Sequence, residues 1–138
     1  HNTGKTFRIN VEGSDPRYSF HWTGISDRLY VFEGPIDLLS YITLHPEGWR
    51  KHNYVACCGT SSLPVLWMLE QNPVLRDVYL CLDNDKAGHT ASLRLAEQIA
   101  EQFGIASSRL IPENKDWNDD LTEQAEQDHA VQMVQQMG

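Results

Sequence analysis

Short, continuous apolar runs alternate with longer amphipathic segments along this chain from about Leu29 onward. Apolar strands that alternate with helices are typical of a parallel sheet buried between helices on both of its faces. Four runs have the length and composition of strands: Leu29–Phe32, Tyr54–Cys58, Val78–Leu82 and Arg109–Ile111. The pattern therefore predicts an α/β fold of three layers around a central, mainly parallel, four-stranded sheet.

Four helices are expected between and after these strands. Their predicted ranges are Pro35–Leu44, Ser62–Gln71, Lys86–Phe103 and Asn118–Met137. The third has the clearest period, because Ala91, Leu95, Ile99 and Phe103 recur every four residues and form one stripe. Gly104 follows this stripe and is a candidate C-cap.

The length and the start of the chain bear on its domain organisation. At 138 residues the chain has the size of one domain, and it begins at His1 within what reads as ordinary domain sequence. This suggests a piece of a longer protein. Thr6–Val11 and Tyr18–Thr23 could pair as an antiparallel ribbon ahead of the first strand. We therefore assign residues 1–28 to an N-terminal β extension or the end of a preceding domain, and residues 29–138 to the main domain.

The composition argues against several classes of protein. No stretch approaches the ~20 apolar residues of a membrane span, and no signal peptide opens the chain. The cysteines Cys57, Cys58 and Cys81 lie in strand-like runs and are odd in number, which predicts buried thiols in a reducing cytoplasm. The net charge is 11 − 19 = −8, whereas nucleic-acid binders are usually basic. We expect this domain to hold nucleic acid weakly on its own.

Acidic residues stand at the carboxyl ends of two predicted strands. Asp83 and Asp85 follow the run Val78–Leu82, and Glu33 closes the run Leu29–Phe32. Carboxylates at i and i+2 on an extended backbone point to the same side, with Cα atoms roughly 6–7 Å apart. Their oxygens suit Mg²⁺ or Mn²⁺ better than Zn²⁺. Ligands of open α/β sheets gather at carboxyl strand ends, so Glu33 and Asp83 would meet there if the first and third strands are neighbours.

Helix capping is an alternative role for three of the acids. Asp85 and Asp116 each precede a predicted helix, where aspartate is a preferred cap. Asp37 lies in the first turn of a predicted helix, where the helix dipole favours a negative charge. Asp83 and Glu33 have no comparable local role, because each closes an apolar strand. These two give the strongest indication of metal-dependent phosphate chemistry.

Four motifs occur in order along the chain. They are Val31–Asp37, Cys58–Thr60, Leu82–Gly88, and the stretch from Pro112 through Lys115–Asp119. Together they resemble the Toprim domain that bacterial primases share with topoisomerases and some nucleases. The form Asp-x-Asp-x-Ala-Gly is most similar to the primase branch, and the Trp-Asn pair of the last motif is similar to primase-like proteins of plasmids and other mobile elements. The motifs span residues 31–120, which is most of the chain.

The resemblance implies a Rossmann-like Toprim fold and a role for five acids. Glu33 takes the place of the glutamate that acts as general acid or base in nucleotidyl transfer. Asp83 and Asp85 take the place of the metal-binding pair, and Asp37 and Asp116 correspond to further acids near the metal. The implied cofactor is Mg²⁺ or Mn²⁺, which would neutralise charge on the reacting phosphate.

Five further residues are weaker candidates for contact with a substrate phosphate. Gly34, Gly59 and Gly88 would let backbone or ligand approach closely. Lys86 and Lys115 could touch a phosphate, although a solvated lysine is an equally simple interpretation.

The chain departs from the primase pattern at two positions. Primases often have a second aspartate two positions after the one that matches Asp116, and Asn118 stands there instead. His89 stands where primases often have arginine. These departures imply that a second metal site or a phosphate contact is built differently here.

These observations predict the Toprim catalytic domain of a DNA primase-like protein, which would make RNA primers by metal-dependent nucleotidyl transfer. It would act in the cytoplasm, in the replication of a plasmid, phage or other mobile element, and neighbouring domains of a longer chain would hold the DNA template and the nucleotides. A Toprim nuclease is an alternative, because water and a 3′-hydroxyl are equivalent nucleophiles at such a site. A non-catalytic scaffold module that kept the fold is another. The presence of Glu33, Asp83 and Asp85 favours activity.

Overall fold

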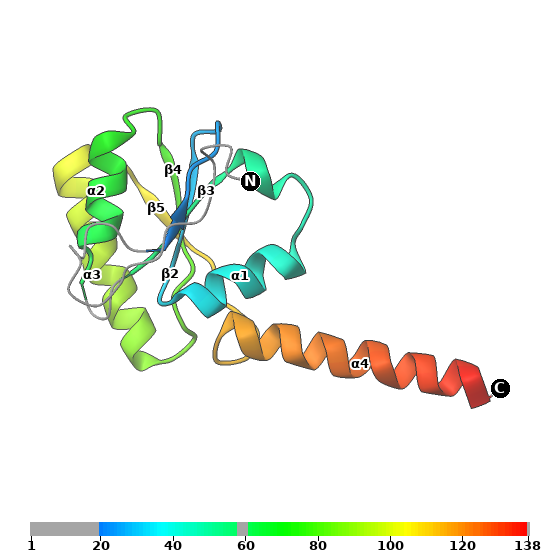
Figure 1. The fold of residues 1–138 in the computed structure, drawn as a ribbon. Helices are drawn as coiled ribbons and strands as arrows, with labels where there is room; N and C mark the ends of the chain where they lie inside the picture. The colour runs from blue at the N-terminus through cyan, green and yellow to red at the C-terminus, as the bar shows by residue number, and fades with distance from the viewer. Residues whose placement is uncertain (1–19, 58–60, 138) are drawn as a thin grey trace.

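The computed structural model describes residues 20–57 and 61–137. Five strands in this part of the chain form one sheet, in the order β1–β3–β2–β4–β5 (Figure 1). They are β1 (His21–Trp22), β2 (Arg28–Phe32), β3 (Asn53–Ala56), β4 (Asp77–Leu80) and β5 (Ser107–Arg109). The last four are parallel. Strands β2 and β4 are neighbours, as the predicted convergence of Glu33 and Asp83 requires.

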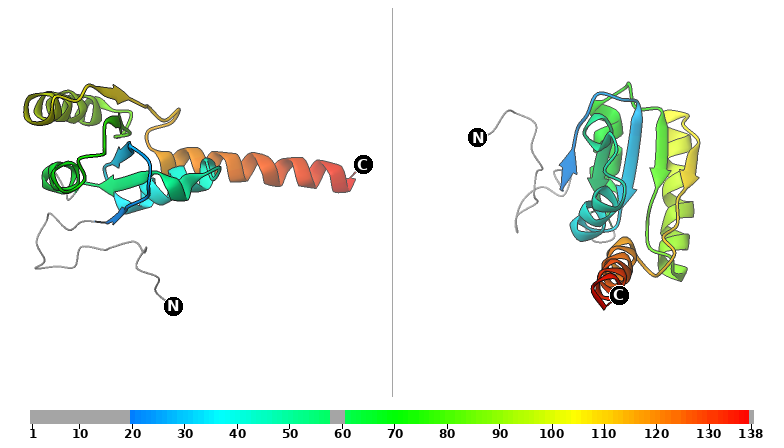
Figure 2. Two further views of the ribbon diagram at one scale, coloured as in Figure 1. Left: turned by 90° about the horizontal axis from the view of Figure 1, so that it is seen from above. Right: turned by 90° about the vertical axis from the view of Figure 1, so that its right-hand side faces the viewer.

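The helices form the two outer layers. They are α1 (Pro35–Leu44), α2 (Leu63–Gln71), α3 (Lys86–Phe103) and α4 (Trp117–Met137), with a short 3-10 helix, η2, at Trp49–Lys51. Helices α2 and α3 lie on one side of the sheet, and α1 with the first turn of α4 on the other (Figure 1). The rest of α4 extends away from the body (Figure 2). None of the helices in the described residues is long and apolar enough to cross a bilayer.

Alternate residues of the central strand β2 enter two separate cores. Leu29 and Val31 face α2 and α3, whereas Tyr30 and Phe32 face α1. The Tyr30 ring stacks against Tyr54 and Tyr79 of the adjacent strands, with centroid distances of 5.3 and 5.4 Å. Burial on both faces explains why the central strands are continuously apolar, and the predicted three-layer α/β fold is confirmed.

The edge strand β5 begins and ends two residues earlier than predicted. Its pairs with β4 run from Ser107 opposite Val78 to Arg109 opposite Leu80. An edge strand is held by backbone hydrogen bonds along one side, so a sequence with two serines can form it. The apolar residues after it, Leu110 and Ile111, lie beyond its end. The predicted strand Arg109–Ile111 was therefore placed two residues too late in the chain.

The other edge carries one strand more than the four predicted. Strand β1 pairs antiparallel with β3, with His21 opposite Val55 and Trp22 opposite Tyr54. It comes from the segment for which a ribbon was predicted. The other half of that ribbon, Thr6–Val11, lies outside the described residues, and the division at residues 28 and 29 stays a prediction.

Candidate metal centre

The first two acids of the site meet where β2 and β4 end. Glu33 directly follows β2, and Asp83 lies three residues after the end of β4. The backbone N–H of Asp83 donates to Glu33 Oε1 at 3.2 Å. Both side chains are half-buried. The neighbouring parallel strands therefore bring residues 50 positions apart into contact.

Three aspartates form a close group at this edge of the sheet. Asp37 from the first turn of α1, Asp83, and Asp116 just before α4 each place one carboxylate oxygen within 4.8 Å of the other two. All three are half-buried. The group unites acids that three different segments of the chain contribute.

Asp37 and Asp116 also hold the start of α4. Asp37 Oδ1 accepts from the backbone N–H of Asn118 at 3.3 Å, and Asp116 Oδ1 accepts from that of Asp119 at 2.8 Å. The Asn118 side chain, at the position where primases often have aspartate, accepts from Ser40 Oγ at 3.3 Å. The predicted capping role of Asp116 thus exists beside its place in the acidic group.

Asp85 lies outside this group of three and caps α3. Its Oδ1 accepts from the backbone N–H of Gly88 at 2.7 Å. In the described part of the chain no hydrogen bond to Asp85 Oδ2 is present, so that oxygen stays available to a cation. Gly88 itself packs against the backbone of Asp83, and a Cβ at this position would overlap the Asp83 carbonyl oxygen. The glycine therefore allows α3 to approach the residues that carry the site.

The loop that carries Asp116 is fastened to the loop that carries Asp83. Asn84 donates its backbone N–H to Lys115 O at 2.7 Å and its side-chain amide to Pro112 O at 3.2 Å. Trp117 is buried, and its indole Nε1 donates to Cys81 O at 3.0 Å. These long-range hydrogen bonds position Asp116 beside Asp83.

Arg109 is a part of the site that the sequence did not reveal. Its guanidinium donates from Nη1 to the carbonyls of Leu80, at 3.2 Å, and Leu82, at 2.7 Å, and from Nη2 to that of Asp83 at 2.7 Å. Nη2 also lies 3.2 Å from His89 Nδ1. Arg109 thus fixes the irregular backbone between β4 and α3. The available signal was an arginine inside a predicted strand, where a charged side chain needs a partner.

The electrostatics of the group are those of uncompensated negative charge. Burial, followed by the charges of the nearby acids, led by Glu33, raises the pKa of Asp83 to about 7. Burial, followed by the charge of Asp116, raises the pKa of Asp37 to about 6. No ion pair with lysine or arginine compensates these carboxylates within residues 20–57 and 61–137. A cation bound among them would remove the repulsion.

The weaker candidates occupy different positions. Lys86 is exposed at the start of α3 and lines a cavity beside Glu33. Lys115 is also exposed, and the space around the Cα of Gly34, the residue before α1, is open. Gly59 lies outside the described residues.

Two solved structures that are similar to this chain come from primases. The DnaG primase catalytic domain bound to single-stranded DNA is 19% identical with a TM-score of 0.50, over 80% of this chain and 34% of that chain. A DNA primase domain from Pseudomonas aeruginosa is 24% identical with a TM-score of 0.47, over 67% of this chain and 28% of that one. The first likeness shows a shared fold.

Comparison of sequences gives the family. An uncharacterized protein of Bacillus anthracis is 27% identical over 157 residues, which cover 99% of this chain and 43% of that protein. The chain thus spans less than half the length of this relative and of both primases. A family model described as Toprim-like matches residues 30–121, a range that includes Glu33 and all four aspartates of the predicted site. The resemblance seen in the motifs is confirmed, and the chain belongs to the Toprim-like family.

Proposed function

We propose that this domain is the catalytic Toprim domain of a primase-like protein and transfers nucleotidyl groups during RNA primer synthesis. The observation that carries the proposal is the group of Asp37, Asp83 and Asp116, with oxygens within 4.8 Å of one another and Glu33 bound to the backbone of Asp83. Like charges brought together in half-buried positions destabilise a fold, so their presence at one edge favours a functional role.

The donor set fits Mg²⁺ or Mn²⁺. Three carboxylates supply hard oxygen ligands, and the raised pKa values of Asp37 and Asp83 are the expected sign of acids brought together without their cation. Asp37, Asp83 and Asp116 would hold the ion, and the available oxygen of Asp85 would hold it or a second one. When bound, a divalent ion supplies neutralisation of the charge that develops on phosphoryl oxygens.

Glu33 is the proposed general base. Oε1 is held by the N–H of Asp83, and no hydrogen bond to Oε2 is present in the described part of the chain. One oxygen thus orients the carboxylate while the other can accept a proton from an attacking 3′-hydroxyl. Glu33 also lines the cavity beside the acids, where a substrate could reach it.

Neighbouring domains are part of the proposal. The net charge of −8 disfavours binding of a nucleic-acid template by this domain alone. Template and nucleotides would be held by other parts of a longer protein, while this domain supplies the metal ligands and the base. We therefore expect the 138-residue chain to bind Mn²⁺ but to make primers poorly without those parts.

Primer synthesis on single-stranded DNA with nucleoside triphosphates and Mg²⁺ tests this function. The protein that carries this domain is assayed beside Glu33→Gln and the control Glu70→Gln, which changes an exposed glutamate of α2. Glu33→Gln should reduce synthesis by about 10²–10⁴-fold, the usual contribution of a general base, and leave Mn²⁺ binding intact. Full activity of this variant would overturn the proposed role of Glu33.

A cleavage assay separates transfer from hydrolysis. A labelled strand is incubated with Mg²⁺ and without nucleotides, again with Glu33→Gln as control. Cleavage in place of synthesis would identify a nuclease that uses the same acids. Absence of both activities together with absence of Mn²⁺ binding would support the scaffold interpretation.

A further inference from the structure

A cavity of about 830 Å³ lies along α3, and residues just before α2 and Glu33 at the end of β2 complete its lining. Its lining residues include Glu33, Lys86 and Arg94, so two cations and one carboxylate face it within the described residues. The lining therefore carries one positive side chain more than it carries negative ones, in a chain of net charge −8. We propose that the cavity binds the nucleotide units of the substrate, with phosphates on Lys86 and Arg94.

The cationic wall is a stripe along α3. Lys86, Thr90, Arg94 and Gln98 follow one another at four-residue intervals, and all four line the cavity. Residues at this spacing lie on one side of a helix, and a rise of 1.5 Å per residue separates Lys86 from Arg94 by about 12 Å along the axis. Both side chains are exposed, and neither makes an ion pair or a hydrogen bond in the described part of the chain. Their charges are therefore available to a ligand.

The remaining walls suit the sugar and the base. Leu82, Ala91 and Leu95 form an apolar floor that continues into the core between α3 and the sheet. Ser61 and Ser62, immediately before α2, add two hydroxyls to the lining. A site with an apolar floor, hydroxyl groups and separated cations matches a ligand that carries both a flat apolar part and phosphates. An inorganic anion would bind the cations without contacting the apolar lining residues.

The cavity ends at the proposed catalytic centre. Glu33 lines it and accepts a hydrogen bond from Asp83, and Lys86 directly follows Asp85. A nucleotide on Lys86 would thus place a phosphate beside the acids, so this inference rests on the proposed function and names its substrate site. The nucleotide could belong to a nucleoside triphosphate or to a single strand, because both present the same groups.

Titration of the 138-residue chain at low salt tests the cavity, with affinities read from the amide NMR signals of α3. The probes are an oligothymidylate and a non-hydrolysable ATP analogue with Mg²⁺. Lys86→Gln combined with Arg94→Gln should weaken at least one probe by about tenfold or more, since two charge-assisted contacts are lost. For the strand, the slope of log K against log salt should become shallower by about 1.4. Ala87→Leu, which fills the cavity from an exposed position, should weaken the same probe.

The control is Arg76→Gln, which removes one positive charge just before β4, at the opposite end of the strand from the acids. It should leave both affinities near those of the wild type. Loss of one probe alone would identify the source of the nucleotide. Unchanged affinity for both probes in the double variant and in Ala87→Leu would overturn the cavity inference. Since Mn²⁺ binding is measured in the same samples, a wild-type chain that binds no Mn²⁺ would count against the proposed function instead.

Discussion

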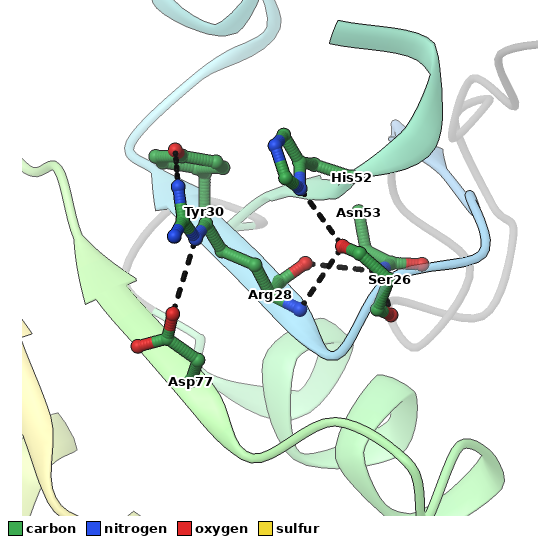
Figure 3. A network of polar contacts seen from close by, with 6 residues as sticks. All are labelled: Ser26, Arg28, Tyr30, His52, Asn53 and Asp77. Atoms are coloured by element: carbon green, nitrogen blue, oxygen red, sulfur yellow. Dashed lines mark hydrogen bonds and ion pairs between the residues drawn. The ribbon is translucent and has the colours of Figure 1, made fainter. Parts of the chain in front are cut away.

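The two ends of the same sheet differ in whether their charged side chains are paired with opposite charges. At the amino end of the parallel strands, Arg28 of β2 and Asp77 of β4 form an ion pair with Nε and Oδ2 3.1 Å apart (Figure 3). Arg28 also donates from Nη1 to Tyr30 Oη at 3.1 Å. At the carboxyl end of the same two strands, Glu33 and Asp83 stand beside further acids. One end is electrically balanced and the other is not.

The polar groups around the ion pair are satisfied as well. Asn53 donates from Nδ2 to the carbonyls of Ser26, at 3.0 Å, and Arg28, at 2.9 Å, and Ser26 Oγ lies 2.8 Å from His52 Nδ1 (Figure 3). This network ties β2 and β3 to the loop before β2. Its members need no ligand to complete them, which is the arrangement expected of a structural network.

Arg109 lies at the carboxyl end of the strands, but its guanidinium is hydrogen-bonded to backbone carbonyls. Arg109 donates to three carbonyls between Leu80 and Asp83, so its hydrogen bonds fix the loop rather than pair with the aspartates. The repulsion among Asp37, Asp83 and Asp116 is therefore not compensated by Arg109. The comparison teaches that the charges of this sheet are compensated at one end and uncompensated at the other, as the proposed metal site requires.

Of the substitutions at the two ends of the sheet, Asp83→Asn should have the largest effect. The amide keeps the size of the side chain and removes one repelling charge, so the metal-free domain should become more stable. Its affinity for Mn²⁺ should fall by about 100-fold or more. Loss of a residue that hydrogen-bonds to a metal ligand already costs about 10–100-fold, and loss of a ligand itself should cost at least as much. Urea unfolding in a chelator and calorimetric titration with Mn²⁺ measure the two effects.

Asp77→Asn is the matched control at the other end. It removes a partly exposed ion pair with Arg28, so stability should fall by about 1 kcal/mol or less, and Mn²⁺ affinity should not change. Stability changes of the same sign in Asp77→Asn and Asp83→Asn would contradict the contrast between the two ends.

Arg109→Gln should have the next largest effect. The amide cannot reach three carbonyls at once, so the loop before Asp83 loses its support, and Mn²⁺ affinity should fall by about 10–100-fold. Arg109→Lys should not restore it, because the ammonium lacks the planar fork of donors. Calorimetric titration of both variants measures the loss.

Arg28→Gln separates positioning from general destabilisation. It removes an arginine that is hydrogen-bonded at the balanced end, so unfolding should become easier while Mn²⁺ affinity stays constant. If Arg28→Gln and Arg109→Gln lowered Mn²⁺ affinity equally, Arg109 would have no special role at the site.

The parts of the fold that repeat a local pattern could be predicted from sequence. The continuous apolar run of β2 indicates burial on both faces of the strand. The apolar residues at every fourth position of α3, among them Leu95 and Ile99, indicate that one face of this helix is buried. Both are properties of neighbouring residues. The position of β5 could not be predicted in this way, because an edge strand is selected by backbone pairing with β4 and not by its own side chains.

The candidate site also has parts that local sequence patterns indicate and parts that depend on distant contacts. The approach of Glu33 to Asp83 could be predicted only on the condition that the first and third predicted strands are neighbours, and the structure supplies that order. The position of Asp116 depends on contacts of Asn84 with residues about 30 positions away, which no local pattern encodes. The role of Arg109 appears only when distant backbone segments are in place, whereas a close approach of backbone at Gly88 was expected from the sequence.

The pH dependence of the metal-free domain tests the same acidic group in the absence of a metal. An aspartate has a pKa near 4 when unfolded, whereas burial and neighbouring acids raise the pKa of Asp37 to about 6 and that of Asp83 to about 7. Between about pH 4 and pH 7 the folded state therefore binds more protons than the unfolded state, and stability falls as the pH rises. The penalty is complete above about pH 7.

The balanced end should oppose this trend. Burial, aided by the charge of Arg28, lowers the pKa of His52, so the folded state holds fewer protons there and gains stability as the pH rises toward the ordinary histidine pKa of about 6.5. Urea midpoints in a chelator from about pH 5 to about pH 8, compared between wild type and Asp83→Asn, isolate the acidic group. The wild type should lose stability relative to the variant as the pH rises. Parallel pH profiles would show that Asp83 is ionised as readily in the folded domain as in the unfolded chain, and the site would then lack the uncompensated charge that a cation is proposed to neutralise.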